Sequence, residues 1–414
     1  MRKSIFVRGP VLSQSGYGEQ SRFALRALRS REDMFDIYIQ PINWGKTGWV
    51  WENDEFRQWM DERINVTSKM IQNKTFQPEI SLQITIPNEF QKMCAVNIGY
   101  TAGIETTLVA PQWLQKGNEM DKVLVVSNHA METYTNTVVE AKNNETGEVF
   151  PYKLETPVHV VWENTPNAEA EPIEGLELPF DFNFLMVSQI SPRKNFINAI
   201  RWWIEEFIDQ EVGLVIKSNL TNNSLIDFAN LTKTIKRIMA EYPERKCKIH
   251  ILHGDLSSGQ MTGLYTNEKI KAAINIAHGE GFGLPLFEAA RQGLPIITIP
   301  WSGQKDFLIH DGQKLFQSVK YTLNNIQPEA VWEGVLVKES QWAYADQGSY
   351  KMTLRKTYKT WHKAKETAEK LKVLVNEKFS NEQLYANFVK CFDNYIQTDL
   401  EWFDGIEDII KEYE

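Results

Sequence analysis

The segment HGEGFGLPLFEAARQGLP, residues 278–295, decides which fold the sequence predicts. It begins after AAINIA, a short apolar run typical of a buried strand, and its PLFEAARQ portion reads as a short helix that starts at Pro285 and stops at Gly293. The residues between strand and helix form a glycine-rich turn. We expect the amides at the start of this helix to face a bound anion, because glycines let a phosphate approach the main chain closely.

Two glutamates flank the expected anion site. Glu288 lies about one turn inside the helix, and helical side chains lean toward the N-terminus, so its carboxylate should reach groups beside the phosphates. Glu280 precedes the helix and would face the other side of the anion. Carboxylates are poor phosphate ligands but good acceptors for hydroxyl groups. The pattern therefore favours a nucleotide-diphosphate sugar as ligand.

Short apolar stretches bounded by turn residues recur along the chain, and amphipathic segments separate them. This alternation predicts βαβ units and two parallel sheets. Two α/β domains of this kind, facing each other, would place a ligand cleft at the carboxyl ends of their strands. The predicted strands are SIFVRG, DIYIQP, ISLQITIP, CAVNIGYT, KVLVVSN, VHVVWE, FNFLMVSQ, EVGLVIKSN, CKIHILHG, AAINIAHGEG and LPIITIPW.

Length and composition agree with two domains. A chain of 414 residues is too long for one hydrophobic core, and ENTPNAEAEPIEGLELPF, residues 163–180, has the composition of a linker. The three cysteines match no zinc or redox spacing. We find no signal peptide or bilayer-spanning run and expect a cytoplasmic protein. The net charge of −9 disfavours nonspecific binding to nucleic acid or anionic lipid but leaves a local basic patch open.

EGFGLPLFE, residues 280–288, resembles the signature of two glutamates with seven residues between them that marks retaining glycosyltransferases of the GT-B fold, family four in particular. LMVSQISPRKNFINAI, residues 185–200, is similar to the first strand and turn of that family's donor domain, where a basic pair holds the diphosphate. Arg193 and Lys194 occupy this place. Ser188 and Gln189 stand where the family more often has glycine and arginine.

The resemblance implies a GT-B fold: two doubly wound Rossmann-like domains facing across a cleft, with C-terminal helices that cross back. We predict an acceptor domain over residues 1–165, a donor domain over 166–375, and helices over 376–414 that pack on the first domain. WSGQKDFLIHDGQKLF, residues 301–316, resembles the segment after the signature, in which Ser302, Gly303 and the Asp311-Gly312 turn fit.

The resemblance also implies the site residues. Glu280, Lys194 and Arg193 are the expected catalytic residues. The expected donor-binding residues are Glu288, Gly281, Phe282, Gly283 and Leu284 at the helix start, Gly16, Tyr17 and Gly18 in a glycine-rich loop after the first strand, and Lys217. Glu105 in the cleft and Ser127 at a strand end are further candidates, whereas His129 is expected to be structural.

Retaining transfer requires stabilisation of a leaving diphosphate and of an oxocarbenium-like centre, rather than a strong base. Lys194, Arg193 and the amides at 281–284 are expected to stabilise the leaving group. No Asp-x-Asp motif occurs in the sequence, so we expect no cofactor and no obligatory metal.

Two other enzyme classes fit less well. Gly16-x-Gly18 is part of a dinucleotide-binding fingerprint, but position 21 is serine and the next strand ends in Gln40 without the ribose-binding acid. A glycosidase needs two carboxyl groups flanking one glycosidic bond, whereas both glutamates here belong to one phosphate-binding turn.

The acceptor is left open by the sequence. Trp44, Trp49 and Trp51 lie in a loop on the expected acceptor side and are candidates for stacking on sugar rings or bases. Arg22, Arg26 and Arg29 follow helical spacing and predict a basic stripe, usually a solvated face and less often a contact for phosphates. A glycan, a lipid-linked carrier and a hydroxylated DNA base, as in phage DNA glycosyltransferases, all remain candidates. A nucleotide-sugar-binding protein without transfer activity is a further alternative.

Overall fold

The first domain is built on a parallel sheet in the order β2-β1-β3-β4-β5-β8. The computed structural model describes residues 2–143 and 145–396. Apolar side chains of the central strands are fully buried, which explains their nearly continuous hydrophobic sequence. The strands are β1 (Lys3–Gly9), β2 (Phe35–Pro41), β3 (Ile80–Ile84), β4 (Val96–Thr101), β5 (Lys122–Val125) and β8 (Val158–Val160).

The second domain repeats this plan in the order β11-β10-β9-β12-β13-β16, again with parallel neighbours. The predicted α/β fold class is confirmed, and every stretch predicted as a strand contains one. VHVVWE contributes β8, the edge strand of the first sheet. The strands of the second sheet are β9 (Asn183–Val187), β10 (Gly213–Lys217), β11 (Lys248–Leu252), β12 (Ile270–Asn275), β13 (Ile296–Thr298) and β16 (Gln317–Ser318).

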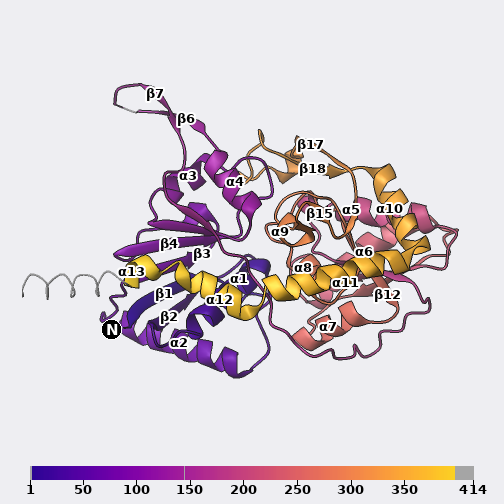
Figure 1. Cartoon of the computed structure of the whole chain (residues 1–414), viewed down its shortest axis with the longest axis horizontal. Coiled ribbons are helices and arrows are strands. Elements are labelled where there is room, and N and C mark those ends of the chain that lie inside the picture. Colours follow the sequence, from indigo (N-terminus) through magenta and orange to yellow (C-terminus); the bar gives the residue numbers. More distant parts are fainter. Residues whose placement is uncertain (1, 144, 397–414) are drawn as a thin grey trace, which may run out of the picture.

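Helices cover both faces of each sheet (Figure 1). Those of the first domain are α1 (Gly16–Arg29), α2 (Glu55–Gln72), α3 (Pro111–Gly117), α4 (Asn128–Asn136) and the 3-10 helix η1 (Pro87–Glu89). Those of the second are α5 (Phe196–Phe207), α6 (Leu225–Ala240), α7 (Ser258–Thr266), α8 (Leu284–Arg291), α9 (Lys305–Leu308), α10 (Gln347–Lys359) and the 3-10 helices η2 (Pro192–Lys194) and η3 (Pro328–Ala330).

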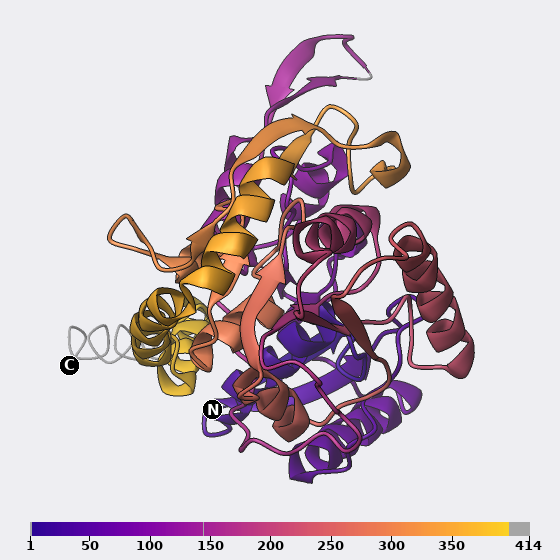
Figure 2. The ribbon, with the colours of Figure 1, turned by 90° about the vertical axis from the view of Figure 1, so that its right-hand side faces the viewer.

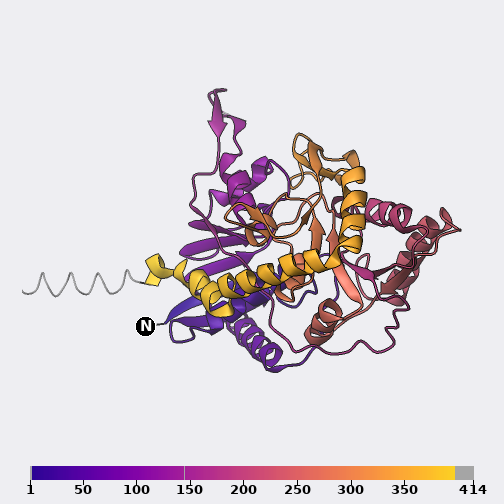
Figure 3. The ribbon, with the colours of Figure 1, turned by 45° about the vertical axis from the view of Figure 1, so that its right-hand side comes forward.

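Small two-stranded pieces complete the fold. They are β6 (Val139–Lys142) with β7 (Val149–Tyr152), β14 (Ile309–His310) with β15 (Gln313–Lys314), and β17 (Tyr321–Asn325) with β18 (Gln341–Ala345). The β6–β7 hairpin projects away from the first domain (Figure 3). No helix in the described part of the chain is long and apolar enough to cross a membrane.

The strand order of each sheet reverses at one point, and this determines where a ligand site forms. The first sheet reverses between β1 and β3, and the second reverses between β9 and β12. At such a point the loops that follow two neighbouring strands run to opposite faces of the sheet. A crevice therefore opens between them at the carboxyl ends of the strands. The loops after β1, β9 and β12 are therefore the ones that border the crevice.

The C-terminal helices cross from the second domain back to the first (Figure 1). They are α11 (Trp361–Lys378), α12 (Asn381–Lys390) and α13 (Asp393–Ile396). Helix α11 packs on α8, and α12 packs on α1. Phe388 of α12 is fully buried and its ring lies 6.0 Å from Phe23 and 5.7 Å from Tyr100, between centroids. Of the helices predicted over 376–414, residues 397–414 lie outside the described residues.

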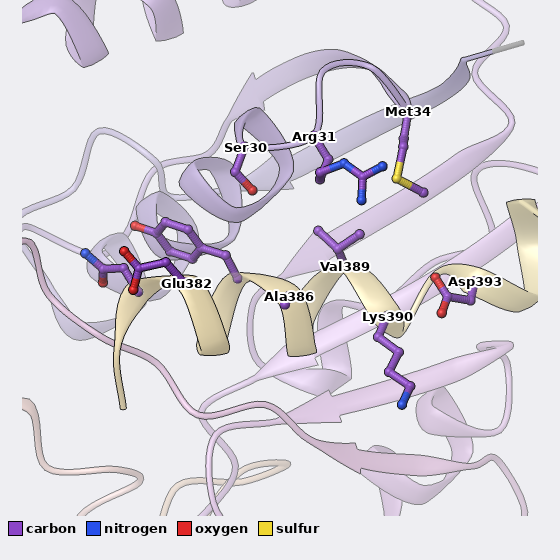
Figure 4. Close-up of a pocket in the computed structure, with 10 residues that line it drawn as sticks. Ser30, Arg31, Met34, Glu382, Ala386, Val389, Lys390 and Asp393 are labelled. Atoms are coloured by element: carbon purple, nitrogen blue, oxygen red, sulfur yellow. The ribbon is translucent and has the colours of Figure 1, made fainter. Parts of the chain in front are cut away.

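The packing of α12 on the first domain leaves a space near the end of α1. A cavity of about 530 Å³ lies there, between α12 and the turn from α1 to β2 (Figure 4). Val389 points from α12 toward Arg31 and Met34 on the other side of this cavity.

The chain passes between the domains twice, through the linker after β8 and through α11, and the two passages touch. Asn164 in the linker donates through Nδ2 to Phe379 O at 2.8 Å and to Asn381 Oδ1 at 3.0 Å. Arg291 at the end of α8 donates to Asn164 Oδ1 at 2.7 Å. Both connections are thus joined at one place.

We expect Phe388→Ala to reduce the free energy of unfolding by about 3–5 kcal/mol, because it leaves a cavity among buried aromatic rings. Urea unfolding followed by circular dichroism measures the change. Met352→Ala on α10, where the side chain is 67% exposed, is the control and should change stability by at most about 0.5 kcal/mol. Equal small losses in both variants would show that α12 contributes little to the fold.

Candidate active site

A cavity of about 1310 Å³ lies between the two domains. It is bordered by the loops after β1, β9 and β12, as the strand orders require, and also by the loop after β10. Of the predicted site residues, all except Gly18 line it. They are Glu280, Lys194, Arg193, Glu288, Gly281, Phe282, Gly283, Leu284, Gly16, Tyr17 and Lys217.

The glycine-rich turn between β12 and α8 presents free amides to this cavity. Its start is fixed, because Glu280 N donates to Ser302 Oγ at 2.7 Å and Gly303 N donates to Glu280 O at 2.9 Å. Gly283 precedes α8 with φ of 97°, a conformation that favours glycine. Within the described residues, the amides of 281–284 donate to no protein acceptor. They are available to a ligand at the positive end of α8.

The basic pair and Glu280 form one ion cluster. Lys194 Nζ lies 2.7 and 2.6 Å from the two carboxylate oxygens of Glu280. Arg193 NH1 donates to Glu280 Oε2 at 3.0 Å and to Gly279 O at 2.6 Å. The pair follows β9 and the glutamate follows β12, and these strands are neighbours at the point where the strand order reverses. The topology therefore brings together residues about 86 positions apart.

Glu105 extends this cluster across the cavity. Its Oε1 lies 3.1 Å from Arg193 NH1, and it comes from the first domain. Burial raises the pKa of Glu105 despite the nearby Arg193. Burial would also raise the pKa of Glu280, but the charges of Lys194 and Arg193 and the hydrogen bonds to it lower the pKa to about 2. Glu280 is thus ionised at neutral pH and holds both cations in place.

Glu288 has a different environment. Its Oε2 accepts a hydrogen bond from Tyr265 Oη at 2.9 Å. Burial raises the pKa of Glu288 to about 7, so this carboxyl group exchanges its proton near neutral pH. It can therefore donate to, or accept from, a hydroxyl group of a ligand. No local sequence pattern indicated Tyr265, which lies in α7, outside the signature.

The first domain contributes the start of α1. Ser15 caps this helix by accepting from Gly18 N at 3.1 Å. Tyr17 Oη lies 2.8 Å from Thr101 Oγ1 and accepts from Ala102 N at 3.3 Å, so its phenol is held within the protein. A Cβ at position 18 would lie 1.9 Å from Ser13 O, so glycine there permits close packing of the loop.

Lys217 lies at the end of β10 and donates through Nζ to Gly254 O at 2.6 Å. Burial lowers its pKa. Ser188 and Gln189, the departures from the family pattern, also line the cavity.

The predicted tryptophans separate into different environments. Trp44 packs against Tyr17 with ring centroids 4.3 Å apart. Trp51 is 58% exposed and lines the cavity, whereas Trp49 does not line it. Trp332, after η3 in the second domain, also lines the cavity with 59% exposure, and no sequence pattern indicated it.

The expected solvated arginine stripe on α1 is wrong. Arg22 is buried and donates to Val11 O at 2.9 Å and Ser13 O at 2.8 Å. Arg26 lies over the ring of Phe56, and Arg29 pairs with Glu55 at 2.6 Å. The helical spacing does place the three arginines on one face, but the start of α2 and its preceding loop pack there. The stripe is therefore not a free solvated face: Arg22 and Arg26 line the interdomain cavity, and Arg29 is paired.

Polar contacts across the domain boundary include residues to which the sequence assigned no role. Asp306 of α9 accepts from Asn128 N at 2.8 Å and from Trp162 Nε1 at 2.8 Å. Trp301 Nε1 donates to Glu105 O at 3.0 Å. Ser127 caps α4, and His129 packs on Trp301 with a pKa lowered by burial to about 4; neither lines the cavity.

Glu163 is a second buried carboxyl group that the sequence analysis missed. It lies where the chain leaves the first domain, lines the cavity and is 5% exposed. Its Oε2 has no hydrogen-bond partner in the described part of the chain. Burial, and to a lesser degree the charge of Glu19, raises its pKa to about 8.

The raised pKa makes Glu163 destabilising at high pH. The folded protein keeps this proton while the unfolded chain loses it near pH 4.5, so stability falls as pH rises toward 8. We expect Glu163→Gln to remove this loss, with a stability gain over the unaltered protein that grows by about 1.4 kcal/mol per pH unit across this range. Thermal unfolding of both proteins between these pH values measures it. A constant difference at all pH values would contradict the assignment.

No model of a known protein family matches the chain, and no curated protein sequence matches it. Solved structures do match over nearly its whole length. Sucrose-phosphate synthase from Thermosynechococcus elongatus has a TM-score of 0.61 at 12% identity, covering 95% of this chain and 99% of that one. A glycosyltransferase from Rickettsia africae has a TM-score of 0.60 at 11% identity, covering 96% and 99%.

The HepE protein of Anabaena, solved in complex with UDP and glucose, has a TM-score of 0.57 at 10% identity, covering 95% of this chain and 100% of that one. At sequence identities of 10–12%, the similarity to these structures shows the fold alone. The two parallel α/β domains, the cavity between their strand ends and the returning C-terminal helices together establish that this chain has the GT-B fold that its sequence predicted.

Proposed function

We propose that the protein is a glycosyltransferase that moves a hexose-type sugar from a nucleotide-diphosphate sugar to a hydroxyl acceptor with retention of configuration. One observation carries the proposal. The amides of 281–284 have no acceptor among the described residues, and they line the interdomain cavity beside Lys194. A diphosphate supplies the acceptors that this arrangement lacks.

The donor's diphosphate would bind at the start of α8. Its oxygens would accept from the main-chain amides, and Lys194 would supply positive charge from the side. Each charge-assisted hydrogen bond contributes about 1.5–3 kcal/mol, so two or three would hold a diphosphate in a partly dry cavity. Lys217 lies at the neighbouring strand end as a further cation.

Glu288 and Glu280 would act on opposite sides of the diphosphate. Glu288, with Tyr265 behind it, would bind a hydroxyl of the nucleoside. Glu280 already accepts from Lys194, Arg193 and Asn275, so we assign it two tasks: holding the cations, and accepting from a hydroxyl of the transferred sugar with its remaining lone pairs.

The cluster suits the departure of a nucleoside diphosphate better than deprotonation by a strong base. As the glycosidic bond breaks, negative charge grows on the leaving phosphate, where Lys194 and the amides are already oriented. Glu280 is ionised and lies on the side where positive charge grows on the sugar. Acceptor attack on the face that the diphosphate leaves would retain the configuration. We assign no step to a metal or cofactor.

UDP is the first nucleotide to test, because the HepE structure holds UDP and glucose. For the acceptor we favour a glycan or glycolipid. Trp51 and Trp332, from the two domains, expose rings at one cavity and suit stacking on a sugar. A DNA acceptor is less well supported, because Arg22 already donates to Val11 O and Ser13 O and Arg29 pairs with Glu55, which leaves only part of the arginine stripe for phosphates.

Turnover tests the proposal directly. Incubated with UDP, GDP and ADP sugars, the protein should slowly release nucleoside diphosphate from one of them, and EDTA should leave the rate unchanged. Lys194→Ala should reduce the rate about 10²–10³-fold, as expected for a lost donor at a developing anion. Lys338→Ala, at a side chain that is 78% exposed, is the control and should leave the rate unchanged. With an acceptor, NMR of the product should show the donor's anomeric configuration.

The main alternative is an inert nucleotide-sugar-binding protein, which Ser188 and Gln189 in the cavity favour. Binding of a donor without turnover on any sugar or acceptor would support this alternative. Failure to bind any nucleoside diphosphate, measured by thermal shift, would remove both functions.

Glu288→Gln should weaken nucleoside diphosphate binding about 10- to 100-fold, because one polar contact to a buried ligand hydroxyl is altered. Isothermal titration calorimetry measures the affinity. Glu366→Gln, on the exposed side of α11, is the control. If Glu288→Gln instead lowers the melting temperature and leaves affinity unchanged, Glu288 is a structural residue.

A further inference from the structure

Helix α6 exposes an unusual surface. Its inner side is ordinary, with Leu231 and Ile235 fully buried. Its first turn, however, carries Leu225 at 85% exposure and Ile226 at 76%, with Phe228 at 40%. The first two values are the highest among the exposed large apolar residues of the described chain. Adjacent aliphatic side chains this exposed have no role in the fold.

The same outer face carries the cations of the helix. With about 100° of rotation per residue, Lys233, Lys236 and Arg237 fall within the same third of the helix circumference as Leu225 and Ile226. All three cations are exposed. We call this surface the α6 face. It consists of the apolar first turn, with Leu225 and Ile226, and the three cations that follow it.

Acidic groups do not neutralise the α6 face. The acid within the helix, Asp227, is buried and lies 2.9 Å from His253 Nε2, and it accepts from the amides of the preceding loop. Glu241 follows the helix and pairs with Arg201 at 2.8 Å, whereas Arg237 acts on it only from beyond ion-pair distance. Within the described residues, none of the three cations of this face forms an ion pair. The local charge is positive on a chain whose net charge is −9.

We propose that the α6 face binds an anionic lipid surface. Leu225 and Ile226 would enter the boundary between headgroups and acyl chains, and the three cations would contact lipid phosphates. A nucleic acid would use the cations but leave the aliphatic side chains in water. An apolar partner protein would leave the cations without counter-charge. A bilayer with anionic headgroups matches both halves of the face.

The position of α6 would place a bound lipid surface beside the interdomain cavity. The loop before α6 lines the cavity through Asn219, Leu220, Thr221 and Asn223. Asn223 Nδ2 donates to Gln14 Oε1 of the first domain at 3.3 Å. Helix α6 itself runs along the outer edge of the molecule (Figure 2). A lipid surface on α6 would thus lie beside the cavity, and the contact requires no transfer activity.

Flotation with vesicles tests the proposal. The full chain should bind vesicles of equal parts phosphatidylglycerol and phosphatidylcholine, bind pure phosphatidylcholine far less, and dissociate at high salt. Lys233→Glu, Lys236→Glu and Arg237→Glu combined should weaken binding at least roughly 100-fold. Leu225→Asp with Ile226→Asp should weaken it roughly 10-fold or more.

Matched controls lie on α10 and α11. Met352→Asp with Val373→Asp alters residues 67% and 56% exposed, and Lys363→Glu with Lys370→Glu alters exposed cations. Both should bind vesicles as the unaltered protein does.

Absent vesicle binding, equal binding to neutral vesicles, or α6 variants that bind like the controls would overturn the proposal. So would α6-dependent binding to a DNA duplex without vesicle binding. Release of nucleoside diphosphate should be unchanged in all variants, which separates this result from the proposed function.

Discussion

The ion cluster of Glu280 with Lys194 and Arg193 is the constraint on which the site depends. A buried carboxylate without cations is strongly unfavourable, and so are two buried cations without a carboxylate. The cluster fixes the β9–α5 turn against the β12–α8 turn, and it thereby sets where the amides of 281–284 lie. Through Glu105 it also reaches the first domain. Removing Glu280 would leave both cations without the carboxylate that they share.

Several contacts between the domains on the cavity side are polar, beside the apolar cluster that Val335 shares with Ile104 and Trp113 of the first domain. Arg193 with Glu105, Trp301 with a main-chain carbonyl, and Asp306 with the start of α4 are directional contacts between groups that water can also satisfy. Such contacts cost little to exchange for water, unlike a dry apolar interface. The returning helix is different, because α12 buries aromatic rings against the first domain.

The sequence predicted the sheets and the glycine-rich turn because these depend on local patterns: apolar runs, glycine and proline positions, and the spacing of Glu280 and Glu288. It also placed Arg193 and Lys194 in the cavity through family resemblance. It did not predict that these cations pair with Glu280, since that depends on which strands are neighbours. It failed for Arg22, Arg26 and Arg29, because helical spacing shows which residues share a face but not what packs on it. Tyr265, Glu163 and Trp332 come from segments with no distinctive local pattern.

The meeting of both chain passages at Asn164 determines how the molecule can open. Two bodies joined at neighbouring points share one pivot, so a rigid rotation that widens the space between them is centred there. Groups beside the pivot, such as Glu163, then shift least, and groups at the far rim travel furthest. Entry of a bulky substrate would therefore occur by the rim swinging outward while the floor of the cavity keeps its shape.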